Sequence, residues 1–390
     1  MNKLKILELF GGIGACTKAL ERLKIDYEIA DYVEIDKYAV KSFNAMHDTN
    51  FEPQDIKEWD KDIEVDLIMH GSPCQSISLA GLQHGADKGS GTRSSLMWET
   101  VRIVEKLKPK YVIWENVKNL LSKKHRHNFD AYLETMEQLG YVNYYQVLNA
   151  KDYGIPQNRE RVFTVSIRKD CVLRGSYWHG IDDNDYEPYF IFPLKQELKL
   201  KLKDMLEDEV DEKYYLSDKM IKYISATGTA NFKNPDCKIN LDIARPLTTD
   251  PNKRAGTTNY LCNELPYNYD LSLKSKQKGL IKLINKTNFV EGEVLNMDLY
   301  NQKTNKNISQ CLTEPHHNSQ RLFDGLRIRK LTPKEYWRLM GFDDEDVDKA
   351  SQVNSNTQLY KQAGNSIVVN VLVAILTNLL QDYIKWSDLN

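Results

Sequence analysis

The chain has 390 residues, of which 28% are charged and 41% are apolar, and its formal net charge at pH 7 is -2. These values are typical of a soluble globular protein with enough residues for two domains. The small net charge is not that of an obvious nucleic-acid-binding protein, although such binding needs only a local basic surface. Residues 1–5 lead directly into an apolar stretch, and the longest apolar run, 367–376, is too short to cross a bilayer. We therefore expect neither export nor membrane insertion.

The cysteines and histidines do not form a recognisable metal site. Six cysteines, at positions 16, 74, 171, 237, 262 and 311, lie far apart without the paired spacing of zinc or redox motifs. This distribution favours a reduced, cytoplasmic protein with free thiols. His125 and His127 lie in a basic segment without a third ligand at a useful spacing, so we expect them at the surface and predict no metal.

The first elements have the pattern of a nucleotide-binding fold. Residues 5–10 are predicted to form a buried strand, followed by three glycines within 11–14 and a helix over 15–23. A strand, a glycine turn and a helix open the nucleotide-binding half of a doubly wound sheet, where glycine lets the backbone approach a ligand closely. A tight turn without a ligand would need the same glycines, and both interpretations stay open for this segment alone.

Two acids follow at informative positions. Glu34 ends the next predicted strand, 29–35, and lies 20 residues after Gly14, where an acid is the usual partner of ribose hydroxyl groups. Asp55, followed by Ile56, occupies a similar place after the next segment and could accept a hydrogen bond from an adenine amino group. Each acid alone could be a surface charge, but together with the glycine turn they predict an adenosine site.

A cysteine follows the third predicted strand, 65–69, in the run Gly-Ser-Pro-Cys-Gln. The run places Cys74 in a loop at the carboxyl end of the strand, the edge where open α/β sheets bind ligands. A thiol ionises nearer pH 7 than a hydroxyl and is more nucleophilic, which suits covalent catalysis, although most lone cysteines are small buried hydrophobic residues. The polar, glycine-rich stretch 79–95 is long enough to predict a functional lid.

The next strands bring further charged groups. The predicted strand 111–114 ends in Glu115, which puts a carboxyl group at the same sheet edge as Cys74. Arg159 and Arg161 precede the alternating strand 162–167 and could hold carboxylates within the fold or donate to a base or phosphate.

The alternation of strands and helices stops in the middle of the chain. Residues 195–213 are predicted to form a charged helical connector, and the region up to 323 is predicted to form short strands and long loops. Regular structure returns with a capping box at 332–335, whose proline stands at the first helical position. A long apolar helix over 367–380 should be deeply buried and pack on the first domain.

In this order, the segments resemble the motifs of bacterial and phage DNA cytosine-5 methyltransferases. The resemblance covers nearly the whole chain and rests on six matches: Phe10-x-Gly12-x-Gly14, Glu34 and Asp55, Pro73-Cys74-Gln75, Glu115-Asn116-Val117, Gln157-x-Arg159-x-Arg161 and Gly364-Asn365-Ser366. The chain has Ile35 and Ile77 where the family often has aromatic residues. Two segments, 245–248 and 308–313, both resemble the penultimate motif, and we favour the second because it lies nearer the final motifs.

The resemblance implies an α/β fold with a doubly wound, Rossmann-like S-adenosylmethionine-dependent methyltransferase domain over 1–170. A smaller, irregular target-recognition domain with its connector would occupy 171–324, and 325–390 would return to the catalytic domain. The residues that the resemblance assigns to the S-adenosylmethionine site are Phe10, Gly12, Gly14, Glu34, Ile35, Asp55, Ile56, Pro73, Asn365 and Ser366.

The resemblance also implies a mechanism. Cys74 would add to carbon 6 of a flipped-out cytosine, Glu115 would hold ring nitrogen 3 and the exocyclic amine, and Arg161 would contact the carbonyl. Arg159 would support the site, and three further residues are expected to contact DNA: Gln75, Ser78 and Arg93.

The expected partner is duplex DNA, bound by a monomer in the cytoplasm at the nucleoid. A separate cognate restriction endonuclease and an orphan enzyme both stay open. Alternative functions are an RNA (tRNA) cytosine-5 methyltransferase and a catalytically inactive DNA-binding regulator on the same fold.

Overall fold

The computed structural model describes residues 3–73, 89–171, 188–215, 259–260, 295–298, 303–306, 309–310, 321–323 and 328–384. The chain divides into two compact units. The first unit comprises 1–149, 160–195 and 367–390, and the second comprises 150–159 and 196–366.

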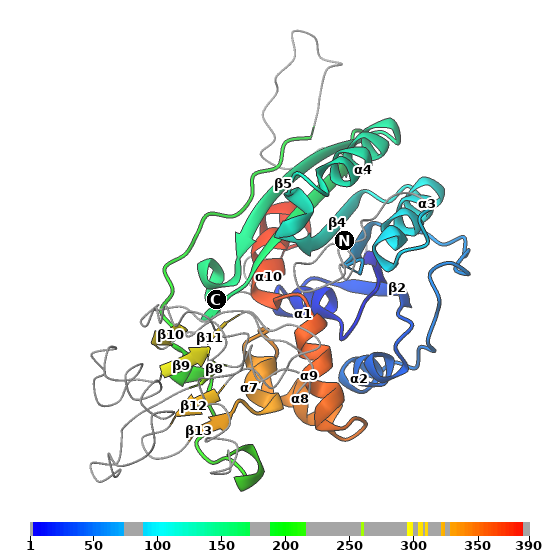
Figure 1. The fold of residues 1–390 in the computed structure, drawn as a ribbon. Helices are drawn as coiled ribbons and strands as arrows, with labels where there is room; N and C mark the ends of the chain where they lie inside the picture. Colours follow the sequence, from blue (N-terminus) through cyan, green and yellow to red (C-terminus); the bar gives the residue numbers. More distant parts are fainter. Residues whose placement is uncertain are drawn as a thin grey trace, which may run out of the picture. The chain divides into compact units, whose positions relative to one another are not determined.

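A six-stranded sheet forms the centre of the first unit, in the order β2-β1-β3-β4-β7-β5 (Figure 1). Its strands are β1 (Leu4–Leu9), β2 (Tyr27–Val33), β3 (Leu67–His70), β4 (Tyr111–Val117), β5 (Tyr141–Asn149) and β7 (Glu160–Arg168). The first four strands in this order run parallel, whereas β7 is antiparallel to both β4 and β5. The strand order reverses between β1 and β3, which is the point where such sheets bind ligands at the carboxyl ends of their strands.

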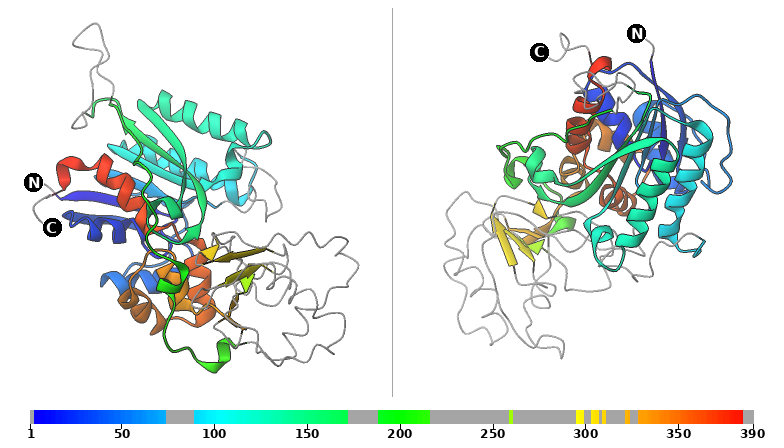
Figure 2. Two further views of the ribbon diagram at one scale, coloured as in Figure 1. Left: turned by 90° about the vertical axis from the view of Figure 1, so that its left-hand side faces the viewer. Right: turned by 90° about the horizontal axis from the view of Figure 1, so that it is seen from above.

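Helices cover both faces of this sheet. Its helices are α1 (Ala15–Arg22), α2 (Lys37–His47), α3 (Met97–Leu107), α4 (Arg126–Gln138) and α10 (Val369–Leu379). Side chains of α3 and α4 share one apolar core with alternate residues of β1, β3 and β4. The other face of β1 carries Glu8, which bonds to Thr17 of α1, and α1 packs against α10. The two layers are visible on opposite sides of the sheet in Figure 2. The predicted doubly wound α/β fold is confirmed.

The predicted strands of the first unit are all present, within a few residues of their expected ends. The sequence did not predict α2 or β5. The N-terminus of α2 is capped by Asp36, whose carboxylate accepts a hydrogen bond from the backbone N–H of Tyr38. The strand β5 has half-exposed and exposed residues over 142–147, because it lies at the edge of the sheet.

The second unit contains a small sheet and a helical segment. The sheet has the order β10-β9-β12-β13, with β8 also paired to β9. Its strands are β8 (Asn259–Tyr260), β9 (Leu295–Asp298), β10 (Lys303–Lys306), β12 (Arg321–Phe323) and β13 (Ile328–Lys330). A separate pair joins β6 (Gln157–Asn158) to β11 (Ser309–Gln310). The helices are α7 (Pro333–Arg338), α8 (Asp344–Ser351) and α9 (Asn356–Asn365).

The capping box of α7 is present as predicted. Thr332 accepts a hydrogen bond from the backbone N–H of Glu335, and the Glu335 carboxylate accepts one from the backbone N–H of Thr332. Glu335 also forms a fully buried ion pair with Arg329, with a shortest distance of 2.8 Å. The pair fixes the junction between β13 and α7.

Two local predictions were wrong. The connector around 195–213 is not a helix: it runs extended, with short 3-10 turns at Leu202–Met205 and Glu212–Tyr214. Arg338 donates hydrogen bonds to the carbonyl oxygens of Met205 and Leu206, so a side chain of α7 satisfies carbonyls that a helix would have bonded internally. His125 is buried, contrary to the expected surface position.

The stretch 356–379, which contains α9 and α10, is long and apolar enough to cross a membrane by length and composition alone. Of its most apolar window, 61% is buried inside the fold, as in the core helix of a soluble protein. The predicted buried helix at 367–380 corresponds to α10. It belongs to the first unit, whereas α7, α8 and α9 belong to the second, although the sequence predicted a return of the whole segment 325–390.

Candidate functional site

The glycine turn follows β1 directly. Gly12 and Gly14 have φ values of 57° and 76°, in the left-handed region that favours glycine. A Cβ on Gly14 would lie 2.7 Å from the rings of Phe43 and His47, so glycine is required there on two grounds. A Cβ on Gly12 would meet only the carbonyl oxygen of Phe10, at 4.0 Å. The turn therefore packs tightly on α2 at Gly14 and leaves open space at Gly12.

Glu34 is attached to this turn. Its Oε2 accepts a hydrogen bond from the backbone N–H of Gly12 at 3.1 Å, and its Oε1 accepts one from the N–H of Asp36 at 2.8 Å. Tyr32 donates its hydroxyl hydrogen to the carbonyl oxygen of Gly12 at 2.6 Å. Burial raises the pKa of Glu34, although both backbone hydrogen bonds oppose that shift. The adjacent Ile35 side chain is 68% exposed.

The segment with Asp55 and Ile56 is held beside the same strand end. Gln54 donates from its backbone N–H to the carbonyl oxygen of Glu34 at 2.9 Å and from its side chain to that of Tyr32 at 2.7 Å. The Asp55 carboxylate accepts a hydrogen bond from the N–H of Lys57 at 3.0 Å. The structure thus brings together the glycine turn, Glu34 and the segment of Asp55, all from the predicted adenosine site.

Arg102 of α3 fixes the far side of this segment, and sequence reasoning missed it. Its Nη2 donates to the carbonyl oxygens of Ile56 at 3.0 Å and Trp59 at 2.8 Å. The Trp59 indole in turn donates to the buried carboxylate of Asp31 at 2.6 Å. An arginine in a helix gives no sequence signal that it binds carbonyls of a loop 46 residues earlier.

A second group of predicted residues lies at the ends of β3, β4 and β7. Glu115 of β4 and Arg161 of β7 form an ion pair, with 3.0 Å between Oε1 and Nε. Both side chains are largely buried, at 12% and 15% exposure. A Cβ on Gly71 would lie 3.9 Å from Glu115 Oε2, so the chain that leaves β3 passes directly beside this carboxylate. Pro73, two residues further on, is half-buried.

The arginine motif is divided between the two units. Arg161 belongs to the first unit, while Arg159 belongs to the second and is 4% exposed. Arg159 donates from Nη2 to the carbonyl oxygens of Ser366 at 2.7 Å and Gly364 at 3.3 Å. Ser366 is buried, whereas Asn365 is exposed. The Arg159 side chain is therefore bonded to the backbone of the last predicted motif, 364–366.

Several predicted residues lie outside the described part of the chain: Cys74, Gln75 and Ser78. Both segments that resemble the penultimate motif also lie outside it, except for the strand β11. Arg93 is described only through its backbone, at the start of the 3-10 turn Arg93–Leu96. Within the described ranges, no group of three or more His, Cys, Asp or Glu side chains is placed to hold a metal ion.

The two described cysteines are poorly suited to nucleophilic catalysis. Cys16 is fully buried, and burial raises the pKa of its thiol well above the usual value. Burial likewise raises the pKa of Cys171 to about 11. A thiol with a raised pKa is almost wholly protonated near pH 7, and the thiolate is the nucleophile.

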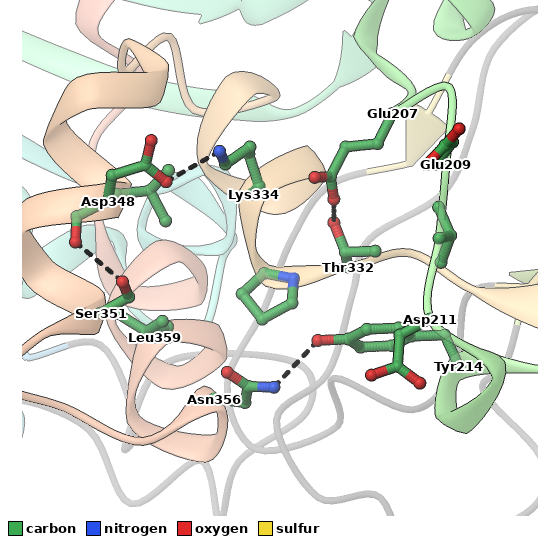
Figure 3. A pocket seen from close by; sticks show the side chains of 13 residues that line it. Glu207, Glu209, Asp211, Tyr214, Thr332, Lys334, Asp348, Ser351, Asn356 and Leu359 are labelled. Carbon is green, nitrogen blue, oxygen red and sulfur yellow. Dashed lines mark hydrogen bonds and ion pairs between the residues drawn. The ribbon is translucent and has the colours of Figure 1, made fainter.

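A pocket in the second unit contains none of the predicted site residues. It has a volume of about 230 Å³ and lies between the connector around Glu207 to Tyr214 and the helices α7, α8 and α9 (Figure 3). Lys334 pairs with Asp348 at 2.7 Å, and Asn356 donates to the Tyr214 hydroxyl at 2.9 Å. These polar groups of the pocket lining are thus paired with each other. We interpret the pocket as a gap in the packing between the connector and the helices that hold it.

Comparison with known proteins places the chain. A family model described as C-5 cytosine-specific DNA methylase matches residues 4–381. The orphan methyltransferase M.SPBetaI of Bacillus phage SPbeta is 32% identical, over 99% of this chain and 99% of the relative. The type II methyltransferase M2.ScrFI of Lactococcus lactis subsp. cremoris is 32% identical, over 97% and 99%.

Solved structures agree at the level of the fold. The Entamoeba histolytica methyltransferase EhMeth superimposes with a TM-score of 0.57 at 17% identity, over 98% of this chain and 99% of that one. The S. pombe Dnmt2 methyltransferase gives 0.55 at 18% identity, over 97% and 99%. At these identities, the likeness shows the fold alone.

Proposed function

Since the chain belongs to the family of C-5 cytosine-specific DNA methylases, we propose that it methylates carbon 5 of a cytosine in a specific duplex DNA site, as a DNA (cytosine-5-)-methyltransferase. The observation that carries the proposal is the buried pair of Glu115 and Arg161 beside Gly71, three residues before Cys74. A carboxyl group and a guanidinium in this arrangement offer complementary partners to the polar edge of a cytosine, beside a strand that Cys74 follows closely in the sequence.

The described residues fit S-adenosylmethionine as the methyl donor, which supplies an electrophilic methyl group on a sulfonium. Glu34 would accept hydrogen bonds from the ribose hydroxyls, and Asp55 would accept one from the adenine amino group. The open space at Gly12 would admit the donor close to the backbone. Further residues proposed for the site are Phe10, Gly14, Ile35, Ile56, Pro73, Asn365 and Ser366.

The proposed chemistry begins at Cys74. Its thiolate forms a bond to carbon 6, and the electron pair of the 5,6 double bond makes carbon 5 nucleophilic. Glu115, protonated or sharing a proton with the base, would hold ring nitrogen 3 and the exocyclic amine. Arg161 would donate to the carbonyl oxygen, so that negative charge does not build up on the ring. Carbon 5 would then bond to the methyl group as the methyl–sulfur bond breaks, and the donor would leave as a neutral thioether. A base would remove the proton from carbon 5, and the electron pair of that C–H bond would restore the double bond and expel the Cys74 thiolate.

The target base has to leave the helix, because a stacked cytosine cannot present its face to a thiol. We propose that Gln75, Ser78 and Arg93 contact the DNA around it and that Arg159 supports the site from the backbone of Gly364 and Ser366. We also propose that the protein acts as a cytoplasmic monomer at the nucleoid. The relatives include both orphan and type II methyltransferases. A restriction endonuclease gene next to the gene for this chain would identify a separate endonuclease partner.

Transfer of tritium from labelled S-adenosylmethionine tests the proposal. The wild-type protein should label duplex DNA as 5-methylcytosine, and Cys74→Ala should not. Cys171→Ser is the matched control, because burial keeps the Cys171 thiol protonated and the replacement should leave labelling intact. Label in RNA alone would favour the RNA methyltransferase, and DNA binding without any label would favour the inactive regulator.

A further inference from the structure

Ser72 connects the end of β3 to the residue before Cys74 and is 4% exposed. Its hydroxyl oxygen accepts a hydrogen bond from the indole Nε1 of Trp114 at 2.9 Å. The side-chain amide of Asn116 donates to the Ser72 carbonyl oxygen at 3.2 Å and, more weakly, to the hydroxyl oxygen at 3.4 Å. Both donors come from β4, so the start of the cysteine loop is attached to the neighbouring strand.

The two donors are the immediate neighbours of Glu115. Because successive side chains of a strand point to opposite faces, Trp114 and Asn116 lie on one face of β4 and Glu115 lies on the other. Glu115 pairs there with Arg161. Residues 114–116 thus hold the Glu115 carboxylate on one face of β4 and Ser72 on the other.

The donors themselves have little freedom. The Trp114 ring is 1% exposed and stacks on His70 with an interplanar angle of 5°, and its centroid is 4.3 Å from that of Tyr132. Burial lowers the pKa of His70 to about 3, so this stack stays uncharged at working pH. The side-chain oxygen Oδ1 of Asn116 accepts a hydrogen bond from the backbone N–H of Val117 at 2.8 Å, which fixes the orientation of the side-chain amide.

We propose that Ser72 is a positioning residue, whose hydrogen bonds to Trp114 and Asn116 set where Cys74 leaves the sheet relative to Glu115. The inference rests on the proposed function and names a side chain for which that function makes no assignment. Pro73 transmits the position because its ring fixes φ. A misplacement of a reacting group by about 1 Å can cost about 100-fold in rate. The loss of a single hydrogen bond at Ser72 can therefore slow the reaction strongly.

The test measures the rate at which the protein forms a covalent adduct with duplex DNA that contains 5-fluorocytosine at the target. Ser72→Ala removes the acceptor, and Trp114→Phe removes the donor but keeps a ring against His70. Each should slow adduct formation and single-turnover methylation by about 10- to 100-fold. The dissociation constants for S-adenosylmethionine and for DNA should change by less than about 2-fold, and Ser72→Thr, which keeps a hydroxyl, should restore most of the rate.

Two controls separate positioning from general stability. Trp337→Phe in the second unit loses a comparable buried indole hydrogen bond, to the carbonyl oxygen of Leu359 at 3.0 Å, and should lower Tm without slowing the adduct. The double variant Ser72→Ala/Trp114→Phe should be no slower than the slower single variant, because both remove the same interaction.

The possible outcomes distinguish this inference from the function beneath it. Wild-type adduct rates in folded Ser72→Ala and Trp114→Phe would overturn the positioning role and leave the proposed function standing. If the rate losses of the two single variants multiply in the double variant, the two substitutions act independently. That result would also overturn the positioning role of the Ser72–Trp114 hydrogen bond. Failure of the wild-type protein itself to form an adduct would overturn the proposed function and, with it, this inference.

Discussion

Glu115 and Arg161 face each other across the antiparallel strands β4 and β7, with 3.0 Å between the glutamate Oε1 and the arginine Nε. The register places Arg161 opposite Val117, two residues from Glu115, so the contact is a diagonal one. Burying a carboxylate and a guanidinium together avoids an unpaired charge at the sheet edge. It also keeps both groups at one place before any substrate arrives.

This pair leads to the first prediction, which concerns the charge at Glu115. Glu115→Gln keeps the shape of the side chain but cannot hold a proton at ring nitrogen 3, so kcat should fall by about 100-fold or more. Because the neutral amide still fits the space, the dissociation constant for DNA should change little. Steady-state kinetics with a duplex substrate would check this, and a kcat within about 3-fold of wild type would remove Glu115 from the mechanism.

The two arginines of one motif should behave differently. Arg159→Lys loses the guanidinium that binds the carbonyl oxygens of Ser366 and Gly364, and we expect a loss of about 1–3 kcal/mol in the free energy of unfolding. Arg161→Lys should leave stability nearly unchanged but reduce kcat, because a lysine cannot reproduce the geometry at Glu115. Urea unfolding and kinetics on both variants test the difference, and similar losses of stability in both would contradict it.

The raised pKa of Glu34 predicts a pH dependence of cofactor affinity. A raised pKa means that the carboxylate takes up its proton at a higher pH than an ordinary glutamate does. Once protonated, Glu34 has lost its negative charge towards the ribose hydroxyls, so affinity should fall as pH drops and should begin to fall above the usual glutamate range. Calorimetric titration with S-adenosylhomocysteine between pH 8 and 5 measures this. Glu34→Gln should bind more weakly and show a flatter profile.

Buried His70 predicts a pH dependence of stability. Its pKa is about 3 in the folded protein, against 6.5 in the unfolded chain, so between these values the unfolded state binds the extra proton. Stability should therefore rise with pH through this window, and at pH 5 the histidine should cost about 2 kcal/mol relative to pH 7. His70→Gln should remove that part of the slope, as measured by urea unfolding at both pH values. An equal slope in the variant would rule out His70 as its source.

Arg102 should affect cofactor binding without touching the cofactor. Arg102→Ala frees the carbonyl oxygens of Ile56 and Trp59, so the loop with Asp55 should become less ordered and bind S-adenosylmethionine more weakly, by about 3- to 10-fold. Lys106→Ala is the matched control, since Lys106 lies one turn further along α3 and binds the exposed Asp60. Equal losses in both variants would assign the effect to α3 as a whole.

The sequence predicted best the elements whose signals are local. An apolar run closed by glycine marked β1 and β3, a four-residue apolar run marked β4, and the capping box marked the start of α7. The edge strand β5 was missed because it buries too few side chains to leave an apolar pattern. The prediction of a helix over the connector 195–213 was wrong because tertiary contacts outweigh local composition there. The charged composition favours a helix, but Arg338 and Glu335 bind the backbone of the connector in an extended form.

The candidate site shows the same division. Residue types and order were enough to predict Glu34, Asp55 and Glu115 at the carboxyl edge of the sheet. The contacts that hold them were not predictable, because Gln54, Arg102 and Trp114 act on backbone or side chains far away in sequence. Their partners depend on strand order and side-chain direction, which a single sequence leaves open.

The packing of α10 on α1 has a consequence for how the protein is made. Residues 15–22 leave the ribosome early, yet the helix that covers them ends at residue 379, and Arg22 bonds to Asn370 at 2.9 Å. At about 5–20 residues per second, the nascent chain carries this uncovered apolar face for tens of seconds. Chaperone binding during translation should therefore protect this face from aggregation until α10 has been made.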